Sequence, residues 1–199
     1  MDDEVPFRIA LSSVFALTMC IVGYHRLRAH TGEPIDRREE GVLLAVTLRL
    51  AGLVLWVAVI AYLINPRWMA WSQLPLPHAV RASGAIVGLL ASLLMYWTLT
   101  NLGENLTDSV VTRSAARLVT AGPYRWVRHP FYVTFALLIA AAVLLSANWF
   151  IAVSGVLVFV LLDVRTPKEE QNLIDRFGDG YRDYMRATGK YLPKVGRQK

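Results

Sequence analysis

The chain has 199 residues, of which 55% are hydrophobic and 18% charged, and its formal net charge is +6. A soluble domain of this length carries more charged and fewer apolar residues, so the composition excludes an ordinary water-soluble enzyme. The apolar residues fall in five blocks, at 9–24, 42–64, 79–99, 131–146 and 149–164. Several approach the ~20 residues that cross a ~30 Å hydrocarbon layer. The sequence therefore predicts an all-α, multi-pass membrane protein with five transmembrane helices.

The first block, 9–24, follows the acidic residues MDDE and has no small-residue cleavage site before YHRLRAH. A cleavable signal peptide begins with a basic segment, so we expect this block to be a retained transmembrane helix.

Basic residues gather on alternate connecting segments. Segments 25–41 and 101–130 hold eight arginines, and segment 165–199 holds nine lysines and arginines, whereas the segments before residue 9 and at 65–78 hold only Arg8 and Arg67. This asymmetry is typical of the positive-inside rule, and it places the N-terminus outside and the C-terminus in the cytosol. The basic excess then serves topology and contact with anionic membrane lipids, and no nucleic-acid partner is expected.

The third block contains the sequence GAIVG, in which Gly84 and Gly88 are followed one turn later by Ser92. Small residues at this spacing favour close helix contact in a membrane. Tryptophans near the outer ends of the blocks predict an aromatic belt on that face, at Trp68, Trp71 and Trp149.

Only the sequence SAN, Ser146 to Asn148, separates the fourth block from the fifth. So short a link predicts a tight antiparallel hairpin of helices four and five. The start of helix four and the end of helix five would then lie at the same membrane face. We therefore expect GPYRWVRHPFY, residues 122–132, to meet DVRTPKEEQ, residues 163–171.

GPYRWVRHPFY is rigid, basic and aromatic. Pro130 suits the first turn of helix four and restrains His129 to an extended backbone. An ordinary helix start with interfacial arginines and aromatic residues would explain Pro130 and Tyr132. It leaves His129 and the turn at Gly122 unexplained.

In the fifth segment, Thr166, Pro167 and Glu169 have the spacing of a capping box, which predicts that a new helix begins there. Glu170 has no part in such a box. The helix would be amphipathic and cytosolic, and FGDG, residues 177–180, would kink or split it. Its apolar side is formed by Leu173, Ile174, Phe177, Tyr181 and Tyr184.

Several familiar site types are missing from the sequence. It has neither an HExxH motif nor a Cys/His cluster, so no metal is expected. It also lacks the GxSxG and SxxK motifs of serine nucleophiles, the Walker A loop and the GxGxxG turn.

Five motifs in order resemble those of the isoprenylcysteine carboxyl methyltransferase family, in a prokaryotic-type member. They are LGEN (102–105), LVTAGPYRWVRHPFY (118–132), RTPKEE (165–170), FGDGYRDY (177–184) and TGKYLPKV (188–195). Leu106 departs from the pattern, which has tryptophan there. The resemblance implies an integral membrane enzyme that uses S-adenosylmethionine. It would form one domain over 1–199, with three transmembrane helices in 1–100 and the cofactor-binding region in 101–199.

The resemblance also implies roles for particular residues. Arg128 and Arg165 would lie near the acceptor, and Glu169 would complete the catalytic set. A cytosolic S-adenosylmethionine pocket would be built from the GPY–RHP segment and the C-terminal helices. Its residues would be Leu118, Val119, Gly122, Tyr124, His129, Pro130, Tyr132 and Glu170.

The acceptor should be a lipophilic or lipidated molecule, with a prenylcysteine-like carboxyl group as the first choice. A carboxylate needs no general base, whereas an amine or thiol would require one, with Glu169 or His129 as candidates. Phospholipid N-methylation and small-thiol S-methylation remain alternatives. So do a nicotinamide-dependent reductase of the sterol reductase type and a non-catalytic membrane protein. In a prokaryote the expected location is the plasma (inner) membrane.

Overall fold

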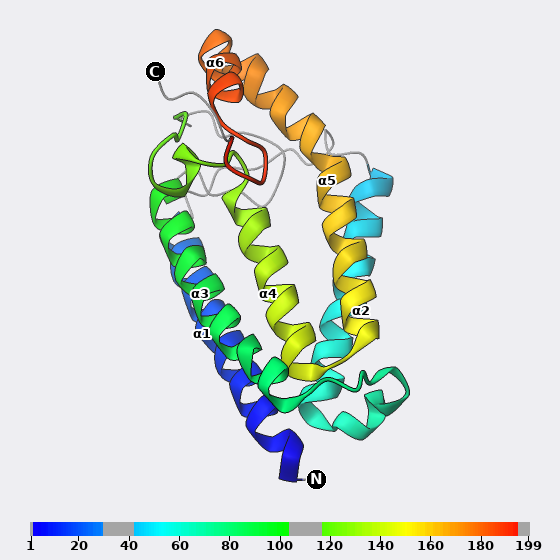
Figure 1. Cartoon of the computed structure of the whole chain (residues 1–199). Coiled ribbons are helices and arrows are strands. Elements are labelled where there is room, and N and C mark those ends of the chain that lie inside the picture. The colour runs from blue at the N-terminus through cyan, green and yellow to red at the C-terminus, as the bar shows by residue number, and fades with distance from the viewer. Residues whose placement is uncertain (1, 30–41, 104–116, 195–199) are drawn as a thin grey trace.

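The computed structural model describes residues 2–29, 42–103 and 117–194, and the regular structure in these ranges is helical (Figure 1). No β-strand forms within them, so the predicted all-α fold is confirmed there. The elements in chain order are η1 (Asp2–Glu4), α1 (Val5–Ala29), α2 (Val42–Ile64), η3 (Pro66–Ser72), α3 (His78–Leu102), η5 (Gly122–Arg125), α4 (Pro130–Ser146), α5 (Trp149–Phe177) and α6 (Asp179–Ala187).

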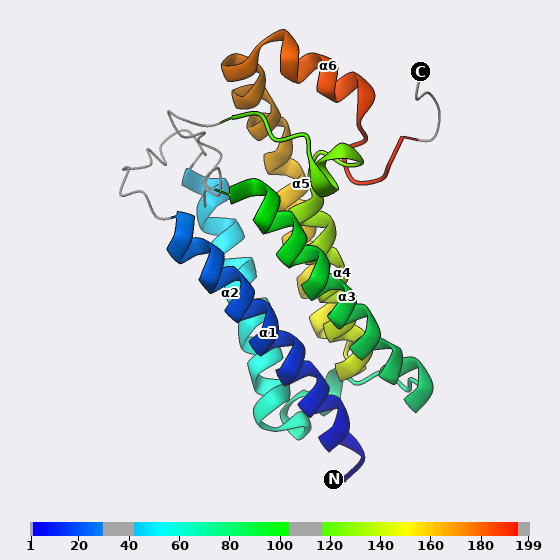
Figure 2. The same cartoon turned by 90° about the vertical axis from the view of Figure 1, so that its left-hand side faces the viewer.

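Helices α1 to α5 run side by side as one bundle (Figures 1 and 2). In the described ranges, α1, α2, α3 and α5 are long and apolar enough to cross a membrane. Helix α4 is apolar but has 17 residues, so a fifth crossing stays a prediction. Large apolar side chains such as Leu53 and Val57 on α2 are exposed on the outside of the bundle, which suits contact with lipid rather than water.

The small residues of α3 permit the close packing that the sequence predicts. A Cβ on Gly84 would lie 2.9 Å from side-chain atoms of Leu144 and Leu145 on α4. A Cβ on Gly88 would lie 2.6 Å from Val14 on α1, and Ser92 hydrogen-bonds to Thr18 across the same contact at 3.0 Å. Helix α3 is therefore in close contact with both α1 and α4.

At the end of the bundle near the N-terminus, an ion pair between buried Arg81 and half-buried Glu4 joins several helices. The guanidinium of Arg81 donates two hydrogen bonds of 2.7 Å to the carboxylate of Glu4 and one of 2.9 Å to the carbonyl of Leu145. Tyr62 on α2 also donates to Glu4, at 2.8 Å. This network fixes the end of the bundle that lies away from η5 and α6 (Figure 1).

The link between α4 and α5 lies at that same end. Asn148 caps α5 by accepting a hydrogen bond from the amide of Ile151, and its own amide donates to Ser72 Oγ at 2.8 Å. The rings of Trp71 and Trp149 meet edge to face with centroids 5.3 Å apart. Two of the three predicted tryptophans, Trp71 and Trp149, thus meet beside this link.

The predicted capping box at Thr166 is wrong. Helix α5 runs without interruption from Trp149 to Phe177, and Pro167 lies inside it. Thr166 Oγ1 donates to the carbonyl of Leu162, one turn earlier, instead of capping a new helix. Proline favours a first turn, but a helix held by its neighbours can accommodate an interior proline at the loss of one backbone hydrogen bond.

The predicted break at FGDG is confirmed. Gly178 ends α5 with a φ of +58°, a left-handed conformation that favours glycine, and α6 begins at Asp179. The chain turns sharply there, so α6 returns over the end of the bundle that carries η5 (Figure 2).

Candidate functional site

The turn η5 lies against the end of α3. Gly122 has a φ of +58°, a conformation that favours glycine, and a Cβ there would lie 2.4 Å from the side chain of Asn101, which would have to move. Pro123 and Tyr124 follow it and are buried. Tyr184 on α6 donates a 2.6 Å hydrogen bond to the carbonyl of Tyr124, which joins α6 to this turn.

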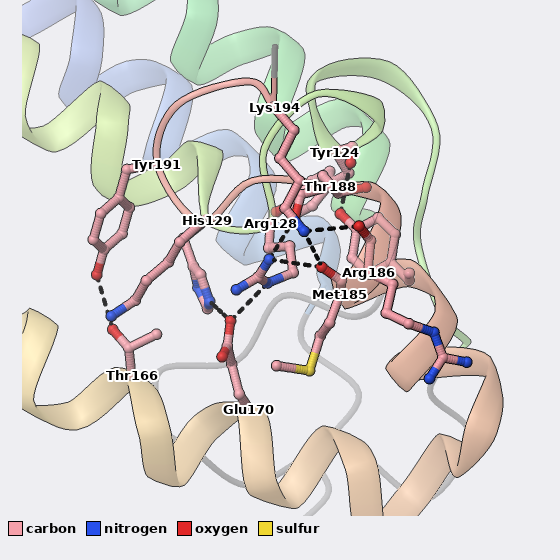
Figure 3. Close-up of polar contacts among 12 residues, drawn as sticks. Tyr124, Arg128, His129, Thr166, Glu170, Met185, Arg186, Thr188, Tyr191 and Lys194 are labelled. Atoms are coloured by element: carbon pink, nitrogen blue, oxygen red, sulfur yellow. Dashed lines mark hydrogen bonds and ion pairs between the residues drawn. The ribbon is translucent and has the colours of Figure 1, made fainter. Parts of the chain in front are cut away.

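Arg128 joins three segments of the chain (Figure 3). Its Nε donates to Glu170 Oε1 on α5 at 2.8 Å, and its terminal nitrogen donates to the carbonyls of Met185 and Thr188 at the end of α6. Its side chain is only 10% exposed. The guanidinium satisfies carbonyl groups that a helix leaves unpaired at its C-terminus, and it pairs with a carboxylate at the same time.

His129 is buried directly before the first residue of α4. Its Nε2 lies 3.1 Å from Glu170 Oε1, so Glu170 is held from two sides. The imidazole stacks on the ring of Tyr132, with centroids 5.4 Å apart and planes inclined by 9°. Tyr132 in turn donates a 2.7 Å hydrogen bond to Glu169 Oε2.

The part of α5 that carries these carboxylates lies beyond the apolar block that ends at residue 164. Burial by itself raises the pKa of the Glu170 carboxyl, but hydrogen bonds from His129 and Arg128 outweigh burial and hold this pKa at about 2. Burial raises the pKa of the Tyr124 and Tyr184 phenols, so both stay uncharged. Glu170 is therefore a fixed negative charge among neutral rings.

No sequence pattern predicts the position of residues 188–194, which we call the C-terminal strap. The amides of Arg128 and His129 donate to the carbonyls of Gly189 and Lys190 at 2.8 and 3.1 Å. Lys190 Nζ donates to Asp163 Oδ1 at 2.5 Å. The strap thus lies along the His129 segment and is tied to α5 as well. The motif TGKYLPKV could have drawn attention to it, but no local pattern gives its partner.

Most of the predicted site residues come together. Segments 122–132 and 163–171 meet as expected, because Arg128 and His129 contact Glu170 while Tyr132 contacts Glu169. Arg165 lies close enough for its charge to act on Tyr132. Of the other predicted residues, Tyr124 is held by Tyr184 and Pro130 begins α4. Leu118 and Val119 are half-buried and precede Gly122 in the chain.

Three residues of the motif segments lie outside the described residues, namely Glu104, Asn105 and Val195, and so does Leu106. Within the described ranges, no group of three or more His, Cys, Asp or Glu side chains could hold a metal ion. Two adjacent carboxylates beside the rings of His129 and Tyr132 do fit a positively charged sulfonium cofactor, because a cation is stabilised by carboxylates and by aromatic faces.

Residues 84–175 match the sequence profile of the isoprenylcysteine carboxyl methyltransferase (ICMT) family. The chain is 35% identical over 94 residues to methanethiol S-methyltransferase 1 of Bradyrhizobium diazoefficiens, a match that covers 45% of this chain and 32% of that protein. It is 30% identical over 128 residues to protein-S-isoprenylcysteine O-methyltransferase of Rattus norvegicus, covering 63% of this chain and 45% of that protein. The chain thus spans less than half the length of these relatives.

The fold is similar to that of the eukaryotic intramembrane Ras methyltransferase ICMT. The TM-score is 0.55 at 19% sequence identity, and the match covers 94% of this chain and 68% of that chain. The sequence match, 84–175, includes Arg128, His129, Tyr132, Glu169 and Glu170, the residues that meet at the site. Residues 84–175, 92 of the 199 residues, are therefore similar to the isoprenylcysteine carboxyl methyltransferase family, and this range carries the site.

Proposed function

We propose that this protein transfers a methyl group from S-adenosylmethionine to a lipophilic acceptor at one face of the membrane. The observation that carries the proposal is the meeting of the α4 start with α5. Glu170 is held there by Arg128 and His129, and Glu169 by Tyr132. These residues lie within the range that matches the methyltransferase family, so family and site geometry support the same chemistry.

When bound, S-adenosylmethionine would supply an electrophilic methyl group, whose bond to sulfur breaks as an acceptor lone pair bonds to the carbon. The residues of this chain would bind the reactants, orient them and exclude water. Glu170 is already paired with the guanidinium of Arg128 and in contact with His129, whereas Glu169 accepts a hydrogen bond from the phenol of Tyr132. Glu169 would therefore be the carboxylate that attracts the sulfonium, and Glu170 would hold Arg128 and His129 in position.

The two arginines would have different roles. The hydrogen bonds of Arg128 go to Glu170 and to the end of α6, so Arg128 would position the site instead of binding the acceptor. Arg165, one turn before Glu169 on α5, would orient an acceptor carboxylate through its guanidinium fork. Tyr124, Leu118, Val119 and Gly122 would line the cofactor side, within a cofactor-binding region that spans 101–199.

The acceptor would be the carboxyl group of a prenylcysteine-like molecule, which reacts in its ionised form and needs no base. A small thiol is the second candidate, because one relative is named a methanethiol S-methyltransferase. A thiol must lose its proton before or during transfer, and Glu169 would then accept it. Both acceptors are lipophilic and would reach the site from the bilayer.

The distribution of arginine and lysine supports an orientation with the site in the cytosol, the C-terminus on the same side and the N-terminus outside. With α4 as a crossing, the chain spans the membrane five times. The location would be the inner membrane in a prokaryote.

Calorimetric titration of the purified protein in detergent with S-adenosylhomocysteine tests the proposal. Micromolar binding is expected, together with weaker binding by Glu170→Ala and unchanged binding by Asp175→Ala, which removes an exposed carboxylate from the same helix. A folded protein that binds no S-adenosylhomocysteine but responds to a reduced nicotinamide cofactor would point to a reductase. Binding of neither ligand would favour a structural membrane protein.

A further inference from the structure

Tyr191, on the C-terminal strap, has no part in the functions proposed above, yet its side chain reaches into the bundle. The backbone places it there, because the amide of His129 donates to the carbonyl of Lys190, the preceding residue. The turn is tight: a Cβ on Gly189 would lie 1.7 Å from the carbonyl oxygen of Leu192. The strap therefore holds Tyr191 in one place beside the start of α4.

The hydroxyl group of Tyr191 is anchored on α5. It donates to Asp163 Oδ1 at 2.9 Å. It also lies 3.0 Å from Thr166 Oγ1 (Figure 3). The ring packs against Phe159 with centroids 5.5 Å apart. Phe159, Asp163 and Thr166 are spaced by four and three residues, so Tyr191 lies along one face of α5.

The other side of the ring faces α4. Its centroid lies 6.0 Å from that of His129 and 6.4 Å from that of Tyr132. Tyr191 thus stands between α4 and α5, in contact with both. Phe159 lies about 16 Å along α5 from Glu170, at ~1.5 Å per residue. The ring of Tyr191 contacts Phe159 and Thr166, so it lies between the Glu170 carboxylate and the apolar part of α5.

We propose that Tyr191 is a specificity-determining residue that limits the bulk of the acceptor between α4 and α5. This inference rests on the methyl transfer proposed above. An acceptor whose apolar chain lies between these helices must share the space with the ring of Tyr191. The wild-type site would therefore favour a compact or short-chain acceptor, which among the two acceptors proposed above favours the small thiol over a long-chain prenylcysteine. Replacement by a small side chain would admit longer chains, because hydrophobic contacts discriminate acceptors by the volume that the site leaves open.

The test compares wild type with Tyr191→Ala and Tyr191→Phe. Two acceptor series are used, straight-chain alkanethiols and N-acetyl-S-alkylcysteines of increasing chain length, and transfer of a labelled methyl group is measured. In Tyr191→Ala, the kcat/KM for the longest acceptors relative to the shortest should rise at least about tenfold. Tyr191→Phe keeps the ring and should keep the wild-type ratio. Trp68→Ala removes an exposed aromatic ring at the other end of the bundle and should also leave it unchanged.

The ratio distinguishes this role from a structural one, because a damaged fold lowers transfer to short and long acceptors alike. S-adenosylhomocysteine titration of each variant separates the two proposals. Wild-type protein that binds no S-adenosylhomocysteine overturns the methyl transfer itself. If S-adenosylhomocysteine binds but Tyr191→Ala and wild type have the same dependence of methyl transfer on chain length, the role of Tyr191 is overturned. The same holds if neither protein transfers a methyl group to any acceptor of the two series.

Discussion

Arg128 and Glu170, which are 42 residues apart in the chain, meet through a single Nε–Oε1 hydrogen bond of 2.8 Å. Their side chains are 10% and 11% exposed, so water screens the pair little. Arg128 also holds the end of α6, and Glu170 also holds His129. The start of α4, the end of α5 and α6 are thus joined at one charged pair, and loss of either partner should loosen all three.

Glu170→Gln removes the charge and keeps the shape of the side chain. The variant leaves the buried guanidinium of Arg128 without its anion, so the free energy of unfolding should fall by about 3 kcal/mol. Thermal unfolding in detergent, followed by intrinsic fluorescence, measures this loss. Asp175→Asn changes an exposed carboxylate on the same helix and should unfold like the wild type. Equal stability of Glu170→Gln and wild type would show that the pair does not hold the site together.

The same pair predicts a pH dependence. The pKa of Glu170 is about 2 in the folded protein, below the ordinary value of 4.5. Its contribution to stability is therefore complete above pH 4.5 and is lost as the pH falls toward 2, since the unfolded state binds the proton first. The midpoint of thermal unfolding should fall over this range in wild type and less steeply in Glu170→Gln. If the unfolding midpoints of the two proteins changed with pH in parallel, the lowered pKa of Glu170 would be contradicted.

Arg165→Ala should lower acceptor turnover more than cofactor affinity. Loss of a charged hydrogen bond to an acceptor carboxylate would reduce kcat/KM about tenfold. The dissociation constant for S-adenosylhomocysteine should remain near that of the wild type. Lys168→Ala, which removes an exposed cation three residues further along α5, is the matched control. An equal loss of turnover and affinity would place Arg165 on the cofactor side.

Gly189→Ala should displace the C-terminal strap, because its Cβ would collide with the carbonyl of Leu192, a backbone atom that cannot rotate away. We expect a lower unfolding temperature together with weaker binding of S-adenosylhomocysteine, since the strap pairs with Arg128 and His129. Gly180→Ala provides the comparison. It has no atom within 4 Å of the added Cβ and lies in α6, so it should be neutral or stabilise the protein by about 0.5 kcal/mol. Equal unfolding temperatures and equal S-adenosylhomocysteine binding in the two variants would show that the strap is needed for neither stability nor cofactor binding.

The sequence by itself determined the helices and several of their ends. Long apolar blocks form helices because a bilayer offers no other partner for the backbone, and Pro130 and Gly178 mark a start and an end through their restricted or left-handed backbone. The short link after Ser146 also predicted that the His129 and Glu170 segments meet, which they do.

Only the tertiary structure decided how the site is held. The capping box at Thr166 is locally plausible, yet packing carries α5 through Pro167. Arg128 could have faced an acceptor, but it pairs with Glu170 and the end of α6. The strap pairs with residues 127–129, about 60 positions away. Local patterns report backbone preference and apolar periodicity, whereas the partner of a polar group is set by which distant segments the packed helices bring within hydrogen-bonding distance.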